Sequence, residues 1–200
     1  MEINKKELKE QEVRTMFITP ALQQKGWAVS VNMREEYYFT DGRVLVVGNQ
    51  HSVAEGKKAD YLLYHKGKPI AVVEAKDNKH AVGGGIQQAM DYAQILDLKF
   101  AYSSNGDAFL EHDFITGKET EIKLEEFPTE EELYNRYLAS KSYTSEELNI
   151  IETPFYYDAH SHEPRYYQRI AVDRTVEAIA KGQQRVLVVM ATGTGKTFTA

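Results

Sequence analysis

At 200 residues, the chain has room for one large domain, or for one domain and the beginning of another. Its 42% hydrophobic and 27% charged residues exclude disordered and fibrous proteins, and its lack of cysteine excludes disulfides, thiolate metal sites and cysteine catalysis. No apolar run approaches the roughly 20 residues of a membrane span, and the net charge of −6 excludes a uniformly basic nucleic-acid binder.

The first predicted element is a helix over residues 7–25. Its apolar residues recur at helical spacing: Leu8, Val13, Phe17 and Leu22. Pro20 is expected to kink or restart this helix, because proline lacks the backbone N–H that a helix interior needs. Gly26 is expected to end the helix, and Trp27 to lie in the core behind it.

Short strands are predicted next. The first three are Ala28–Asn32, Tyr37–Thr40 and Val44–Val47, with a turn at Asp41-Gly42. Two longer apolar runs, Ala59–His65 and Pro69–Ala75, flank Lys66-Gly67-Lys68, and this pattern predicts a β-hairpin.

The rest of the chain predicts alternating helices and strands around an acidic segment. Residues 121–163 carry 11 acidic and 3 basic side chains, and the polar stretch 141–163 within this segment predicts a linker. The remaining predicted elements are the helix Ile86–Leu96, the strands Phe100–Ser103 and Ala108–Glu111, the helices 129–140 and Tyr166–Ala180, and a buried parallel strand Arg185–Met190.

A glycine-rich loop, Ala191-Thr-Gly-Thr-Gly-Lys-Thr197, follows the last predicted strand. Gly193 and Gly195 would let backbone N–H groups face phosphates, while Lys196 would reach the β- and γ-phosphates and Thr197 would bind Mg²⁺. The alternative interpretation is an ordinary glycine-containing turn. The form A-x-x-G-x-G-K-T resembles motif I of superfamily 2 helicases, and Gln168 resembles the adenine-reading glutamine of that superfamily.

The strongest candidate for hydrolytic chemistry is Asp60 with Glu74 and Lys76. The pattern [DE]-x-K occurs six times, but only Glu74-Ala75-Lys76 ends an apolar strand. Because side chains alternate along a strand, Glu74 and Lys76 share one face, and the hairpin brings the start of its partner strand, Asp60, beside Glu74. The alternative interpretation is a surface ion pair at the end of a hairpin.

Such a cluster suits phosphodiester cleavage. Two carboxylates and a backbone carbonyl, which we assign to Ala75, can hold Mg²⁺. The metal would activate a water molecule, and Lys76 would orient that water and offset transition-state charge. Gln88 and Tyr92 lie four residues apart on the next predicted helix, so both can face the same site.

Asp60, Glu74-Ala75-Lys76, Gln88 and Tyr92 together resemble the core of PD-(D/E)-x-K nucleases in its RecB-like form, with Ala59 in place of the usual proline. The resemblance implies an α/β fold with a mixed sheet flanked by helices. It assigns Asp60 and Glu74 as metal ligands, Lys76 as the catalytic lysine, and Gln88 and Tyr92 as the supporting pair. Glu12 of the first helix is a further candidate to approach the metal.

The order of these motifs resembles the restriction (R) subunit of type I restriction–modification enzymes. It implies a nuclease domain over residues 1–145, a linker over 146–163, and the first elements of a RecA-like superfamily 2 helicase domain over 164–200. The implied activity is Mg²⁺-dependent cleavage of double-stranded DNA, coupled in the full-length subunit to ATP-driven translocation. The implied partners are DNA and the modification and specificity subunits, in the prokaryotic cytoplasm and without a membrane.

Two other interpretations of the whole chain stay open. The first domain could be a nuclease-like module that docks DNA or a partner without cutting it, or an accessory domain of a helicase. His160 and His162, with Asp158 nearby, could suggest a metal site, but a solvated linker explains them, and this is the interpretation we favour.

Overall fold

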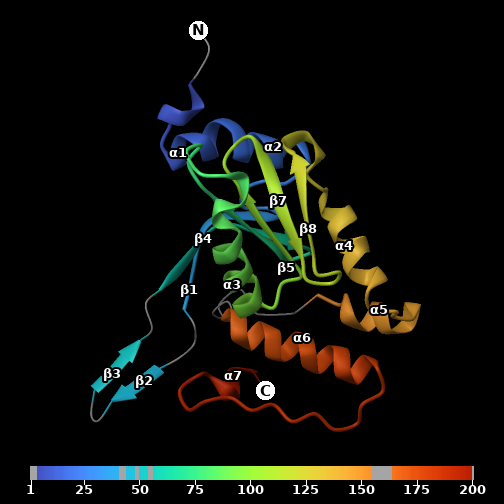
Figure 1. Cartoon of the computed structure of the whole chain (residues 1–200). Helices are drawn as coiled ribbons and strands as arrows, with labels where there is room; N and C mark the ends of the chain where they lie inside the picture. Colours follow the sequence, from blue (N-terminus) through green and yellow to red (C-terminus); the bar gives the residue numbers. More distant parts are fainter. Residues whose placement is uncertain (1–3, 41–43, 48–49, 54–55, 155–163, 200) are drawn as a thin grey trace. The chain divides into compact units, whose positions relative to one another are not determined.

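The computed structural model describes residues 4–40, 44–47, 50–53, 56–154 and 164–199 (Figure 1). The chain forms two compact units, Met1–Ser140 and Lys141–Ala200. None of the helices in these described ranges combines the length and apolar character needed to cross a membrane. The turn expected at Asp41-Gly42 and the residues Asp158, His160 and His162 lie outside the described residues.

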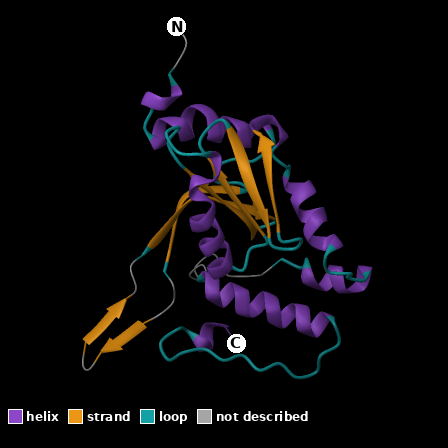
Figure 2. Cartoon of the chain, viewed as in Figure 1, coloured by secondary structure: helices purple, strands orange, loops and turns teal. Residues whose placement is uncertain are grey.

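A six-stranded mixed sheet forms the centre of the first unit (Figure 2). Its order is β1 (Met33–Phe39), β4 (Lys57–His65), β5 (Lys68–Ala75), β6 (Phe100–Ser104), β7 (Ala108–Asp113) and β8 (Lys118–Lys123). Only the β5–β6 pair is parallel, and helix α3 (Ile86–Leu96) makes the crossover between those two strands. Strands β2 (Val44–Val47) and β3 (Gln50–Val53) form a separate hairpin. The predicted mixed α/β sheet is therefore present.

The other helical segments of this unit flank the sheet in Figure 2. They are η1 (Lys5–Glu7), α1 (Glu10–Val13), η2 (Arg14–Ile18), α2 (Thr19–Gln24), η3 (Val82–Gly85), η4 (Leu124–Glu126) and α4 (Glu130–Ala139). Side chains alternate across each strand, and the continuous burial of the central strands β4, β5 and β6 shows that both faces of the sheet are covered there. One face joins the first helices and α4 in a core that includes Leu22, Trp27, Val73, Phe100 and Leu133.

The predicted helix over residues 7–25 begins at Glu10 and contains a π turn, η2, just before Pro20. The N–H of Thr19 bonds to the carbonyl of Arg14, five residues back, instead of the usual four. A proline ring clashes with the carbonyl four residues earlier, so a wider turn at this point accommodates it. Gly26 ends the helix with φ +87°, and Trp27 is fully buried, as predicted.

The predicted strand Ala28–Asn32 is wrong. The carbonyl of Ala28 instead accepts hydrogen bonds from the N–H groups of Val31, Asn32 and Met33, and the Asn32 side chain accepts one from the Ala28 N–H. Asparagine favours such turns because its short side chain competes for nearby backbone groups. Strand β1 consequently begins at Met33, four residues before the predicted start at Tyr37.

The second unit contains α5 (Ser145–Ile151), α6 (Tyr166–Ala180) and α7 (Lys196–Thr199). Helix α5 lies within the segment expected to be a linker, and it begins with a capping box between Thr144 and Glu147. Residues 155–163 lie outside the described part of the chain, so a linker there stays a prediction.

The predicted strand Arg185–Met190 is also wrong. The segment has no regular secondary structure, and Leu187 and Val189 are 87% and 84% exposed. A buried parallel strand needs neighbouring strands to pair with and helices to cover it. Among the described residues, no strand pairs with this segment.

Candidate functional site

The β4–β5 hairpin brings Asp60 and Glu74 together. Tyr61 pairs with Val73 in this ladder, so Asp60 and Glu74 occupy the next opposed positions on one face. The N–H of Asp60 donates to Glu74 Oε1 at 3.3 Å, and the N–H of Ala75 donates to Asp60 Oδ2 at 2.8 Å. Asp60 is 6% exposed and Glu74 only 1%. The pair is therefore buried, and a surface ion pair does not describe it.

This burial changes the chemistry of Glu74. Desolvation is the largest cause that raises the pKa of its carboxyl, the charge of Asp60 raises it further, and the pKa reaches about 8. The hydrogen bond from the Asp60 N–H and the charge of Lys76 both lower the pKa of Glu74, but by less than burial and Asp60 raise it. Two adjacent acids cannot both ionise cheaply in a buried site, so burial favours the protonated form of Glu74 near neutral pH, and a cation between the two acids would favour the ionised form.

Lys76 extends the cluster toward α3. Its Nζ lies 4.0 Å from Glu74 Oε2 and donates to Gln88 Oε1 at 3.1 Å. Gln88 Nε2 in turn donates to the Tyr92 hydroxyl at 3.1 Å, one helical turn further on. The structure thus joins all five predicted residues, Asp60, Glu74, Lys76, Gln88 and Tyr92, through consecutive contacts.

Glu12 does not approach this site, contrary to expectation. Its carboxylate accepts a hydrogen bond from the N–H of Lys9 at 2.8 Å and caps α1. Glu10, two residues earlier, is instead the first-helix carboxylate whose charge raises the pKa of Glu74.

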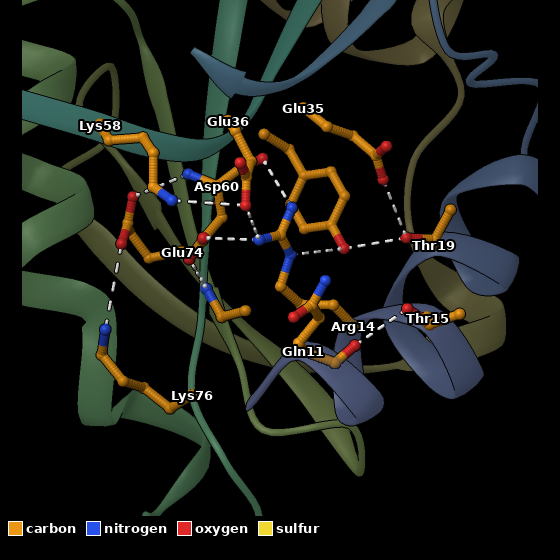
Figure 3. Close-up of polar contacts among 12 residues, drawn as sticks. Gln11, Arg14, Thr15, Thr19, Glu35, Glu36, Lys58, Asp60, Glu74 and Lys76 are labelled. Carbon is orange, nitrogen blue, oxygen red and sulfur yellow. Dashed lines mark hydrogen bonds and ion pairs between the residues drawn. The ribbon is translucent and has the colours of Figure 1, made fainter. Parts of the chain in front are cut away.

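Two residues beside the Asp60–Glu74 pair, Gly85 and Arg14, are not among the site residues predicted from sequence. Gly85, just before α3, donates its N–H to Ser103 Oγ at 2.9 Å. A Cβ atom at Gly85 would stand 3.2 Å from Glu74 Cβ and 3.3 Å from Lys76 Cε. Arg14 places its guanidinium 3.2 Å from Asp60 Oδ1 (Figure 3). The run Gly83-Gly84-Gly85 was a visible signal for close backbone approach, whereas a single arginine in a helix was not.

The donor set fits a small hard cation. Carboxylate oxygens are the ligands that Mg²⁺ prefers, and a cation between Asp60 and Glu74 would offset both the burial and the repulsion that raise the pKa of Glu74. Within the described ranges, no group of three or more His, Cys, Asp or Glu side chains is placed to hold a metal. Water and the Ala75 carbonyl are the further ligands we predict.

In the second unit, the predicted phosphate loop precedes α7. Gly193 and Gly195 both have positive φ, +82° and +80°, which side chains disfavour. Gln168 is buried, and its Nε2 donates to the Thr194 carbonyl at 3.0 Å. Lys196 Nζ donates to the Met190 carbonyl at 3.3 Å, and Thr197 is exposed. Nucleotide contacts by these residues stay predictions.

The comparisons with known proteins cover both units. Residues 31–142 match the family model described as the second domain of the type I restriction enzyme EcoKI endonuclease subunit, and residues 161–200 match the type III restriction enzyme res subunit. The chain is 42% identical to the type I restriction enzyme EcoAI endonuclease subunit of Escherichia coli over 204 residues. This alignment covers 100% of this chain and 25% of that protein.

Two further relatives agree with these matches. The EcoKI endonuclease subunit of Escherichia coli K12 is 28% identical over 262 residues, which cover 96% of this chain and 21% of that subunit. A solved fragment of an HsdR subunit of a type I restriction enzyme from Vibrio vulnificus YJ016 matches with TM-score 0.80 and 44% identity, over 96% of this chain and 36% of that chain. The predicted fold class is therefore confirmed.

The chain spans about a quarter of the length of the curated relatives it matches. The EcoKI family model covers residues 31–142, which is more than half of the chain. The same kind of subunit recurs in the curated relatives and in the solved fragment. This chain therefore belongs to the family of type I restriction enzyme endonuclease (R) subunits.

Proposed function

We propose that the first unit is a Mg²⁺-dependent nuclease domain that cleaves double-stranded DNA within a type I restriction complex. The observation that supports it most directly is the meeting of Asp60 and Glu74 in a buried pair, where burial and the charge of Asp60 raise the pKa of Glu74 to about 8. Packing alone gives no reason to bury two acids side by side, because such burial costs free energy. A metal-binding role supplies the compensation.

Each residue of the cluster has a separate task in this proposal. Asp60 and Glu74, with the Ala75 carbonyl, would hold Mg²⁺, which when bound polarises the phosphate and lowers the pKa of a coordinated water. Lys76 stands at the edge of the pair, where its ammonium group can donate to a water or a phosphate oxygen. Gln88 restrains that ammonium group, and Tyr92 restrains Gln88.

The second unit would contribute the beginning of an ATP-driven translocase. Gln168, Gly193, Gly195, Lys196 and Thr197 are its proposed nucleotide contacts. The match of residues 161–200 to the res subunit family of type III restriction enzymes supports this role. The modification and specificity subunits would supply DNA recognition.

Replacing either acid tests the proposed nuclease. In the assembled complex, Asp60→Ala and Glu74→Ala should each reduce DNA cleavage by about 10³-fold or more while ATP hydrolysis continues, because the metal would lose half of its carboxylate ligands. Glu121→Ala is the matched control, since Glu121 belongs to another E-x-K sequence on an exposed part of β8. Unchanged cleavage in both variants would refute the nuclease assignment and favour a module that docks DNA without cutting it.

Gly85→Ala tests the close approach of α3 to the site. The added Cβ would lie 3.0 Å from Ser103 Oγ and would also press on Glu74 and Lys76. Because this displaces the Glu74 and Lys76 side chains, we expect cleavage to fall by about 10-fold or more. Stability should fall by only about 1 kcal/mol, because the φ of −104° suits alanine, although alanine is a poorer N-cap residue than glycine.

Gly56→Ala is the control for this change, since nothing lies within 4 Å of an added Cβ there. Cleavage assays and urea unfolding would be run on both variants. Equal cleavage by the two variants would show that the site tolerates a wider spacing from α3.

A further inference from the structure

Arg14 is a buried cation on the side of the carboxylate pair opposite Lys76 in Figure 3. It begins the π turn η2 and is 9% exposed. Its Nη1 lies 3.2 Å from Asp60 Oδ1 and donates to Glu36 Oε1 at 3.2 Å. Burying a guanidinium is costly unless it is fully engaged, so these contacts are strong constraints on both partners.

The aromatic ring of Tyr61 holds the guanidinium in place. Arg14 lies 5.0 Å from the ring centroid, and its Nε donates to the Tyr61 hydroxyl at 3.4 Å. That hydroxyl is itself 2.9 Å from Thr19 Oγ1. A guanidinium stacked and bonded in this way has little freedom to rotate.

Backbone strain occurs at the same point. Glu36 faces Asp60 in the β1–β4 ladder, between the pairs Glu35–Tyr61 and Tyr37–Ala59, and it has φ +51°. A glutamate in this region costs free energy and persists only where the surroundings demand it. Lys58 Nζ lies 3.3 Å from Glu36 Oε1 and stabilises its charge from the other side.

These contacts fix the plane of the Asp60 carboxylate. Oδ1 pairs with Arg14 and Oδ2 accepts the Ala75 N–H, so rotation about the last side-chain bond would break one or both interactions. Each carboxylate oxygen has a second lone pair that such a contact leaves available to a cation.

We propose that Arg14 is a positioning residue that presets the orientation of Asp60 for metal binding. This inference rests on the proposed nuclease function. It makes Arg14 and Glu36 an outer layer of the metal site, in which Arg14 acts on the cation through Asp60. The opposite role, a counter-ion that competes with the metal for Asp60, predicts tighter metal binding once the positive charge of Arg14 is removed.

Arg14→Lys separates these roles, because lysine keeps the charge but loses the planar guanidinium, in which Nη1 contacts Asp60 and Glu36 while Nε donates to the Tyr61 hydroxyl. Using Mn²⁺ as the probe in calorimetric titrations of the full chain, we expect binding about 10- to 100-fold weaker than in the wild type. Arg34→Lys is the matched control, since Arg34 lies on β1 against the Tyr64 ring, 5.2 Å from its centroid. It should leave Mn²⁺ affinity unchanged.

A double-mutant cycle with Asp60→Asn shows whether Arg14 acts through Asp60. If it does, Mn²⁺ should bind the double variant as weakly as Asp60→Asn alone. Additive losses of Mn²⁺ affinity in the double variant would overturn the proposal. It would also be overturned if Arg14→Lys lowered the urea unfolding midpoint but left the Mn²⁺ affinity unchanged. Tighter binding by Arg14→Met would also overturn it, because that outcome identifies a competing counter-ion.

The proposed function can fail separately. Wild-type chain that binds no Mn²⁺, or binds it unchanged after Glu74→Ala, would refute the metal site itself. Wild-type binding that is lost in Glu74→Ala but retained in Arg14→Lys would refute only the role of Arg14.

Discussion

Glu74→Gln should stabilise the first unit at pH 8 to 9 when no divalent cation is present, by up to about 5 kcal/mol. The pKa of Glu74 is about 8 in the folded chain, against an ordinary value of 4.5, because of burial and the neighbouring charge of Asp60. The folded state therefore holds this proton more tightly than the unfolded chain. The resulting stability is fully present below about pH 4.5 and is lost as the pH rises to about 8.

Urea unfolding in a chelator between pH 5 and pH 9 would measure this effect. The difference between Glu74→Gln and wild type should grow as the pH rises, because glutamine imitates the protonated acid at every pH. Glu121→Gln, on exposed β8, should show no such trend. Parallel curves for Glu74→Gln and wild type would contradict the raised pKa.

The same proton reports metal binding. A divalent cation between Asp60 and Glu74 favours the ionised form of Glu74, so saturating Mg²⁺ should remove most of the pH dependence of the wild-type chain. Removing the metal with chelator should restore that dependence.

Lys76→Ala should lower the DNA cleavage rate of the complex by about 10³-fold, within the range that one charged transition-state donor supplies. Mn²⁺ affinity should change by only a few-fold, because an ammonium group cannot be a metal ligand and Lys76 Nζ lies as far as 4.0 Å from Glu74 Oε2. This combination separates a chemical role from a metal-binding one. Single-turnover cleavage and Mn²⁺ titration of the same preparation would measure both.

Lys57→Ala is the control for this experiment. Lys57 lies 6.0 Å from the centroid of the Tyr92 ring, near the site, and its loss should weaken DNA binding at most. If Lys76→Ala cleaved at the wild-type rate at saturating DNA, Lys76 would have no part in the chemistry.

The β4–β5 hairpin and α3 were predictable from sequence because their information is local. Two apolar runs on either side of Lys66-Gly67 define the hairpin, and the i, i+4 spacing of Gln88 and Tyr92 defines the helix face. Once these elements form, the opposed positions of Asp60 and Glu74 follow from antiparallel geometry.

The rest depends on contacts between distant parts of the chain. Arg14 reaches Asp60 across 46 positions, and nothing in its own neighbourhood indicates a buried cation. Strand β8 was missed because its residues are mostly exposed and polar, so no alternating pattern marks it. The segment Arg185–Met190 fails as a strand for the converse reason, because strong local propensity does not replace pairing partners.

One rung of the sheet carries a consequence for how this family can vary. Phe39 of β1 and Lys57 of β4 are ladder partners, so the six-stranded sheet loses the chain after Phe39 and regains it at Lys57, at one edge-to-edge pair. Insertions or deletions between Phe39 and Lys57 can change the length of this segment without moving Asp60, which lies three residues after Lys57, because the Phe39–Lys57 pair fixes both ends of the segment. Relatives can therefore differ in length between Phe39 and Lys57. A label or an added module can also be inserted there with little effect on the Asp60–Glu74 pair.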